Sequence, residues 1–258
     1  MIGIFDSGLG GLTVLKPLRE LLPRADITYF GDIRNAPYGN RSHEELTRLT
    51  VDAIRLLRAH GATGIVSACN SVSASLSLSL FDTLELGPGR LIEMVGPTVA
   101  SLKGTDERLL LCATSATIRS QIYQSAFAMV GKDIATLALP DLAGAVERGA
   151  PQAELEAIVL SELMEINIDS IDAVILACTH YPLAVEAFRR VLPDHVRIIN
   201  PGTVVAARVA RAWEHEETGE GRMRLIISAE SAPFRAMAKQ AFPDEDYEIE
   251  VLEHAETA

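Results

Sequence analysis

Short apolar runs alternate with longer amphipathic stretches along most of the chain. The runs are rich in Val, Ile, Leu and Ala, and most of them stop at small polar or turn-forming residues, which is typical of buried strands that end in turns. They predict strands at 2–5, 27–30, 64–68, 109–113, 134–139, 173–177, 196–199 and 225–227.

Between these runs, apolar residues recur at the spacing of one face of a helix. Ser42 and Glu45 have the spacing of a capping box, and Pro151 stands where a helix can begin. The spacing predicts helices over 12–22, 43–60, 151–166 and 203–214, and a further helix after the Thr114–Thr117 turn.

Strands that alternate with helices are typical of βαβ units, so we expect an α/β fold of three layers with mainly parallel sheets. A weak internal repeat relates 65–71 to 174–180 and places Cys69 and Cys178 109 positions apart. It predicts two similar lobes with the active site in the cleft between them, lobe one being 1–96 plus 205–258 and lobe two 97–204. The alternating segment 247–251 predicts an edge strand with exposed glutamates.

Composition narrows the class of protein. The chain has 258 residues and a net charge of −12, which argues against nucleic acid or an anionic membrane as a partner. Seven acidic residues of the segment 244–256 account for much of this charge, so we expect a solvated edge. No apolar run approaches the roughly 18 residues of a membrane helix. The first residues have no basic signal-peptide region, so we expect a cytoplasmic protein.

The cysteines and histidines carry no metal or disulfide pattern. Cys69, Cys112 and Cys178 are an odd number of widely spaced cysteines, which makes a disulfide framework improbable. The histidines form no close pair, so we expect no metal site. None of the four lysines ends an apolar strand beside a cysteine, so no Schiff-base lysine is indicated and we expect no cofactor.

Cys69 and Cys178 are the strongest candidates for catalytic residues in the sequence. Each ends a predicted strand and precedes a predicted helical turn, where the helix N-terminus would stabilise a thiolate. Two thiols at equivalent places of two lobes suit the inversion of a carbon centre, which needs a base on one face and an acid on the other. The alternative is two unrelated buried cysteines, the interpretation that we adopt for Cys112 inside its apolar run.

Other polar residues stand at the ends of the predicted strands, where α/β sheets bind ligands. His180 could tune the Cys178 thiol or be structural, and Asp6 could polarise a thiol or cap the first helix. The Gly8–Gly11 turn is either a tight strand-to-helix connection or an anion site. The remaining candidates are Ser7, Asp32, Asn70, Ser71, Thr114, Thr117, Thr179 and Asn200.

Several segments together resemble the cofactor-independent glutamate racemases of the aspartate/glutamate racemase family. They occur in the family's order between residues 3 and about 202, and the Asp-Ser-Gly and Cys-Thr-His-Tyr-Pro segments together are specific. The segments are 3–11, Gly31-Asp32, Pro37-Tyr38-Gly39, Ala68-Cys69-Asn70-Ser71, Thr114 with Thr117, Val146-Glu147 with Gly149, and 178–183.

The resemblance implies an isomerase that interconverts L- and D-glutamate without a cofactor and supplies D-glutamate for peptidoglycan and hence cell-wall biogenesis and cell shape. It implies that Cys69 takes the α-proton from one enantiomer and Cys178 from the other, assisted by Asp6, Glu147 and His180. It further implies a homodimer with a small-molecule substrate. The substrate would be held by Asp6, Ser7, Pro37, Tyr38, Gly39, Asn70, Ser71, Thr114, Thr117, Thr179 and His180.

Three positions depart from the family's usual residues. Ser71 stands in place of Thr, Leu139 in place of a frequent Cys, and Asn200 in place of a frequent Asp. None of them removes a proposed base. Two alternative functions stay open at this point: a related racemase that acts on aspartate or another small acid, and a non-catalytic small-molecule binding protein with two lobes.

Overall fold

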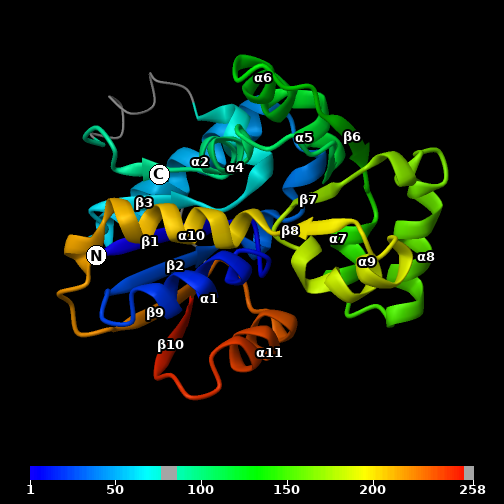
Figure 1. Cartoon of the computed structure of the whole chain (residues 1–258). Coiled ribbons are helices and arrows are strands. Elements are labelled where there is room, and N and C mark those ends of the chain that lie inside the picture. The colour runs from blue at the N-terminus through cyan, green and yellow to red at the C-terminus, as the bar shows by residue number, and fades with distance from the viewer. Residues whose placement is uncertain (77–85, 253–258) are drawn as a thin grey trace.

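The computed structural model describes residues 1–76 and 86–252, whose strands form two separate sheets (Figure 1). The larger sheet has the strand order β10-β9-β2-β1-β3-β4, and the smaller sheet has the order β6-β5-β7-β8. Every pair of neighbouring strands in them is parallel. The predicted α/β fold with parallel sheets is therefore confirmed.

The strands of the larger sheet come from both ends of the chain. They are β1 (Ile2–Asp6), β2 (Ile27–Gly31), β3 (Gly64–Ser67), β4 (Leu91–Ile92), β9 (Met223–Ile227) and β10 (Tyr247–Val251). The helices that belong to it are α1 (Leu12–Leu21), α2 (His43–Ala59), α10 (Pro201–Ala212) and α11 (Ala232–Ala241), with the 3-10 turns η1 (Ile33–Asn35), η2 (Tyr38–Asn40), η3 (Asn70–Ser75) and η6 (Glu214–Glu216).

The smaller sheet is built from the middle of the chain. Its strands are β5 (Leu109–Ala113), β6 (Ala135–Ala138), β7 (Ala173–Ala177) and β8 (Arg197–Ile199). Its helices and 3-10 turns are α4 (Val95–Leu102), α5 (Ser115–Ser120), α6 (Ile122–Met129), α7 (Leu142–Glu147), α8 (Gln152–Leu163), η4 (Ile168–Ser170), η5 (Tyr181–Ala184) and α9 (Val185–Val191).

Helices cover both faces of the larger sheet. Leu15 of α1, Val205 of α10 and Phe234 of α11 join one buried cluster with the strands. On the opposite face, Ile54 of α2 packs with Phe5 of β1 in a second cluster. Strands that are buried on both faces read as nearly continuous apolar runs, which is why the sequence located them so well.

The smaller sheet is covered in the same way. Val159 of α8 and Phe188 of α9 pack with Val174 on one face, and Phe127 of α6 packs with Ile175 on the other. The internal repeat also has a structural counterpart, because the order β2-β1-β3-β4 corresponds strand by strand to β6-β5-β7-β8. The repeat therefore places the ends of β3 and β7 at equivalent positions in the two sheets.

The predicted strands agree with the observed ones to within two residues at each end. The capping box of α2 is also present, because the Ser42 hydroxyl accepts a hydrogen bond from the Glu45 N–H at 3.3 Å and the Glu45 carboxylate accepts one from the Ser42 N–H at 3.0 Å. Five of the helices and strands were not predicted, namely β4, α4, α7, α9 and α11. They are short, with ten residues or fewer, so the apolar repeat has too few turns to stand out.

After β8 the chain returns to the larger sheet through α10, which packs against α1. The predicted boundary between residues 204 and 205 lies inside this helix. The division into 1–96 plus 205–258 and 97–204 stays a prediction, although the two sheets use strands from 2–92 with 223–251 and from 109–199.

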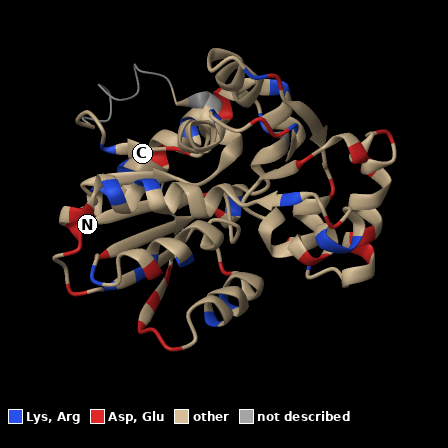
Figure 2. Cartoon of the chain, in the orientation of Figure 1, with Lys and Arg blue, Asp and Glu red and all other residues tan. Residues whose placement is uncertain are grey.

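Charged residues belong mainly to outer helices and connecting loops, whereas the central strands contain few (Figure 2). The acidic run 244–246 lies in the turn before β10, and Glu248 and Glu250 are exposed on that strand. β10 is at the edge of its sheet, as predicted. Glu253 and Glu256, counted with this acidic segment, lie outside the described residues. Across 1–76 and 86–252, the helices are too short or too polar to cross a membrane.

Trp213 anchors the end of α10 to the larger sheet, and its replacement tests this packing. The side chain is 2% exposed, and its indole N–H donates to the Gly89 carbonyl at 3.0 Å. We expect Trp213→Ala to lower the free energy of unfolding by roughly 3–5 kcal/mol because it leaves a cavity. The measurement is chemical denaturation followed by circular dichroism, since Trp213 is the chain's one tryptophan.

Leu160→Ala is the control for this prediction, because Leu160 on α8 is 54% exposed. We expect it to change the free energy of unfolding by less than about 0.5 kcal/mol. Equal stabilities of Trp213→Ala and the wild type would contradict the packing described for α10.

Candidate active site

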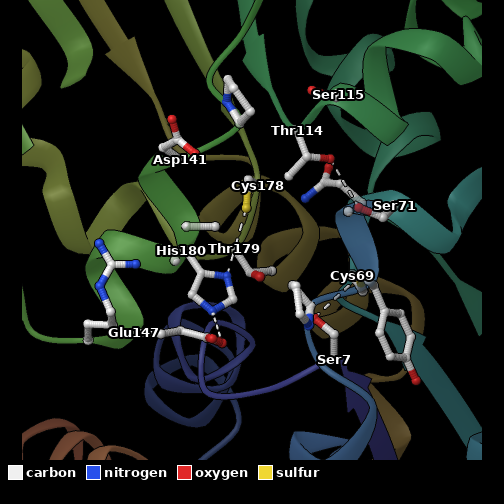
Figure 3. A pocket seen from close by; sticks show the side chains of 18 residues that line it. Ser7, Cys69, Ser71, Thr114, Ser115, Asp141, Glu147, Cys178, Thr179 and His180 are labelled. Carbon is white, nitrogen blue, oxygen red and sulfur yellow. Dashed lines mark hydrogen bonds and ion pairs between the residues drawn. The ribbon is translucent and has the colours of Figure 1, made fainter. Parts of the chain in front are cut away.

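A cavity of about 200 Å³ lies at the carboxyl ends of strands from both sheets, where ligands bind in α/β folds (Figure 3). Most of the residues predicted for the site line it. They are Ser7, Pro37, Tyr38, Gly39, Cys69, Asn70, Ser71, Thr114, Glu147, Cys178, Thr179 and His180. Asp6 and Thr117 do not line the cavity but contact residues that do.

Cys178 lies beside an imidazole that is itself held by a carboxylate. The His180 Nδ1 is 3.8 Å from the Cys178 sulfur, and its Nε2 is 2.8 Å from the Glu147 Oε1 (Figure 3). Burial alone would lower the pKa of His180, but its hydrogen bonds to Cys178 and Glu147 raise that pKa to about 10. The raised pKa favours the protonated, positively charged form of the ring, which faces the Cys178 sulfur.

Cys69 lies across the pocket in a different electrostatic setting (Figure 3). Its thiol is 3.8 Å from the Ser7 hydroxyl, and the strongest influences on its pKa include no cationic group. Burial, followed by the charges of Asp6 and Cys178, raises the pKa of Cys69 to about 12. The Ser71 N–H lowers it, as expected at the start of a helical turn, but burial outweighs that effect. Cys69 is therefore a thiol at neutral pH.

Asp6 joins the two halves of the site. It is fully buried, and its Oδ2 accepts hydrogen bonds from the N–H groups of Gly8 and Gly11 at 3.1 and 2.9 Å. Its Oδ1 accepts one from the Thr179 hydroxyl at 3.2 Å. Burial raises the pKa of Asp6, whereas the charge of His180 and these hydrogen bonds lower it. The Asp6 carboxylate thus connects the turn after β1 to Thr179, the residue that follows Cys178.

The glycines of the Gly8–Gly11 turn permit a close approach between the two sheets. A Cβ at Gly10 would lie 2.4 Å from the Thr179 Oγ1 and 2.7 Å from the His180 Nδ1, and one at Gly8 would lie 3.0 Å from the Glu147 Oε1. No side chain fits in these spaces without moving its neighbours. Of the two interpretations given to this turn, the tight connection is the one that the geometry supports.

Asp32 fixes the wall formed by 37–39. Its carboxylate accepts hydrogen bonds from the Tyr38 hydroxyl at 2.6 Å, from the Ser228 hydroxyl at 2.7 Å and from the Asn35 amide at 3.0 Å. Burial and the charge of Asp32 raise the pKa of Tyr38. Asp32 therefore acts on the cavity through the Tyr38 segment, since it does not line the cavity itself.

Three hydroxyl groups lie beside this wall, at the junction of the two sheets. The Ser71 Oγ is 3.2 Å from the Thr114 Oγ1, which is 3.1 Å from the Thr117 Oγ1. Thr114 also caps α5 by accepting from the Thr117 N–H, and Gly39 packs against it. The hydroxyl that Ser71 retains in place of the family's usual Thr is thus in use at the junction of the two sheets.

The other two departures from the family's residues lie outside the cavity lining. The Asn200 Oδ1 accepts from the Gly202 N–H at 2.8 Å and so caps α10, a role that Asp would also fill. Leu139 is fully buried, and its carbonyl accepts from the Tyr181 hydroxyl at 2.8 Å.

Cys112 is fully buried in β5 away from the cavity, as predicted, and all three cysteines are free.

Six lining residues were missed by the sequence analysis. The signal that could have found two of them is helical spacing from Glu147, because Ala143 and Gly144 precede Glu147 by four and three residues on one face of α7. The missed residues are Ser115, Pro140, Asp141, Ala143, Gly144 and Arg148.

Within 1–76 and 86–252, no group of three or more His, Cys, Asp or Glu side chains could hold a metal ion.

Known proteins resemble this chain over most of its length. The family model described as Asp/Glu/Hydantoin racemase matches residues 13–209. A glutamate racemase of Aquifex aeolicus is 32% identical over 246 residues, which cover 95% of this chain and 94% of that protein.

Solved structures agree with these relatives. A glutamate racemase from Thermus thermophilus, in complex with β-chloro-D-alanine, is 31% identical with a TM-score of 0.82 over 97% of this chain and 96% of that one. A glutamate racemase from Francisella tularensis, in complex with D-glutamate, is 25% identical with a TM-score of 0.85 over 98% and 97%.

The fold and these relatives define the protein as an amino-acid racemase, an isomerase. The chain belongs to the Asp/Glu/hydantoin racemase family. The resemblance noted from the sequence motifs is thereby confirmed. The alternative of a non-catalytic binding protein is set aside.

Gly10→Ala tests the close approach without touching a reacting group. Because the new methyl group would displace Thr179 and the His180 ring, we expect racemase activity to fall by about 100-fold, the usual effect of a misplacement near 1 Å. Gly104→Ala is the matched control, since a Cβ there meets nothing within 4 Å. Activity of folded Gly10→Ala protein equal to that of Gly104→Ala would contradict the role given to this glycine.

Proposed function

We propose that this protein interconverts L- and D-glutamate by a mechanism with two bases, Cys69 and Cys178. The observation that carries the proposal is the placement of the two thiols. They follow equivalent strands of the repeated topology, belong to different sheets and line one cavity. Inversion at carbon needs a base and an acid on opposite faces, and a repeated fold supplies such a pair.

The proposed step conserves protons and charge. One sulfur, as thiolate, takes the α-proton, and the electron pair of the C–H bond moves onto the α-carbon and its carboxylate. The other sulfur, as thiol, then gives its proton to the opposite face of the same carbon. The first cysteine ends as a thiol and the second as a thiolate, so the reverse reaction starts from the complementary state.

The surroundings of the two sulfurs indicate which of them carries a proton in the free enzyme. The His180 Nδ1 faces the Cys178 sulfur at 3.8 Å, whereas burial raises the pKa of Cys69 and so favours its thiol form. The free enzyme is thus set for Cys178 as base and Cys69 as acid. Glu147 supports this state by holding the His180 ring, and Asp6 supports it through its charge on both sites.

The carbanion is the costly intermediate, because no cofactor delocalises its charge in this proposal. Its stabilisation then depends on preorganised donors in a site that excludes water. We assign the α-carboxylate and amino group of the substrate to the polar residues around the two sulfurs, with Thr117 acting through Thr114. These residues are Asp6, Ser7, Asn70, Ser71, Thr114, Thr117, Thr179 and His180.

Glutamate is the substrate that the observations favour. The cavity of about 200 Å³ suits one amino acid, and 37–39 form a wall that could frame a side-chain carboxylate. The similar proteins are named glutamate racemases, and one of them was solved with D-glutamate. We propose that the product supplies peptidoglycan synthesis and that the enzyme needs no cofactor. The homodimer stays a prediction.

The test is the conversion of L-glutamate followed by chiral chromatography, with cysteine variants. We expect Cys69→Ala and Cys178→Ala each to lower the racemisation rate by several orders of magnitude, because the acid and base act as a unit. Cys112→Ala, which removes a buried thiol away from the cavity, is the control and retains most of the rate. A wild-type protein that leaves L-glutamate unchanged would refute the proposed substrate, and a fully active Cys69→Ala or Cys178→Ala protein would refute the mechanism.

A further inference from the structure

One hydrogen bond between the two halves of the molecule bears on the cavity without belonging to its lining. The Tyr123 hydroxyl on α6 donates to the Asn70 Oδ1 on η3 at 2.7 Å. Asn70 is 3% exposed and lines the cavity, whereas Tyr123 is fully buried and does not. The bond therefore links a helix of the smaller sheet to a cavity residue that follows β3 of the larger sheet.

Only one end of the Asn70 amide has a hydrogen-bond partner among the described residues. Its Oδ1 accepts the bond from Tyr123, but its Nδ2 is buried and has no hydrogen-bond partner among the described residues. A buried N–H group without an acceptor is destabilising, so such a group in a binding cavity points to an acceptor that the ligand brings. The carboxylate oxygen of an amino acid is the strongest acceptor available to it.

Tyr123 decides which end of this amide is the donor. An amide side chain can turn by half a rotation and exchange its oxygen and nitrogen, because the two ends have nearly the same shape. A hydroxyl can donate to the oxygen or accept from the nitrogen, and in the observed arrangement it donates to Oδ1 and leaves Nδ2 as the free donor. Burial, with the charge of Glu93, raises the pKa of Tyr123, so its hydroxyl keeps the proton that it donates.

The surroundings of Tyr123 make it a rigid support. Its ring lies in the buried cluster that packs α4 and α6 on the smaller sheet, together with Val99 and Phe127. A ring packed on all sides has few alternative rotamers, so the position of its hydroxyl is set by the core and not by the ligand.

We propose that Tyr123 is a positioning residue that holds the Asn70 amide with its Nδ2 toward the substrate carboxylate. The assignment of that acceptor rests on the proposed function, an amino-acid carboxylate in the cavity. Tyr123 acts through Asn70 and touches no reacting atom. It also makes the donor dependent on contact between the two sheets, because the amide is oriented only when α6 and η3 meet.

A double-mutant cycle tests this inference. Tyr123→Phe keeps the ring and removes the hydroxyl, and we expect kcat/KM for glutamate to fall roughly tenfold, the worth of one hydrogen bond to a charged group. In an Asn70→Ala background the same change should have almost no further effect, because its target is gone. Equal losses from Tyr123→Phe in both backgrounds would overturn the proposal, since a structural role alone produces them.

Two further variants keep the test decisive. Asn70→Asp retains an acceptor for Tyr123 but replaces the donor with a negatively charged oxygen that repels the substrate carboxylate, so we expect its kcat/KM to fall at least as far as that of Tyr123→Phe. An Asn70→Asp protein with wild-type kcat/KM would overturn the proposal even if Tyr123→Phe did not fold. Thr50→Val is the matched control, because it removes a buried hydroxyl of α2 that bonds to the Leu46 carbonyl outside the cavity lining, and its kcat/KM should not change.

The failure of this inference can be told apart from the failure of the proposed function. Wild-type protein that does not turn over glutamate would refute the proposed function before any variant is compared. Wild-type turnover with additive effects of Tyr123→Phe and Asn70→Ala would leave the proposed function standing and refute only the positioning role.

Discussion

The buried hydrogen bond between Asp6 and Thr179 is the contact on which the site depends. It joins the end of β1 in the larger sheet to the residue after Cys178 in the smaller one, at 3.2 Å. The contact exists because Gly10 leaves room for Thr179 and His180. Parallel strands of one sheet present their carboxyl ends at one edge, and here the edges of two sheets meet and place groups on two sides of the cavity. The repeated strand order supplies both edges.

The site is symmetric in topology and asymmetric in charge. Cys178 has a cationic neighbour, whereas Cys69 has the Ser7 hydroxyl and the raised pKa of a buried thiol. In the proposed mechanism this difference is useful, because an acid and a base must be present at the same time. In that mechanism the Glu147–His180 pair would select the starting state, while the substrate and the donors around it carry the charge that develops.

The sequence predicted the features that depend on short-range patterns. Strand ends, the repeat and the strand-end cysteines were readable because buried parallel strands are apolar runs and polar residues mark where they stop. Glu147 was named only through the resemblance, and its contact with His180 was not predicted, since 33 residues separate them and no local pattern joins them. Asp141 and Arg148 were missed because α7 is short, and Tyr123 because its ring reads as core. The raised pKa of Cys69 depends on burial, which the pattern at the end of β3 does not measure.

The central claim is that two sulfurs act on opposite faces of one carbon, and isotope incorporation in heavy water tests it most directly. The proton taken by one thiol should stay on that side, and the hydrogen delivered by the other should come from solvent. The account predicts that D-glutamate formed from L-glutamate carries deuterium at the α-carbon from the first turnover, while the remaining L-glutamate carries almost none. Early product that retains the substrate's own α-hydrogen would show transfer by a single group and would contradict the account.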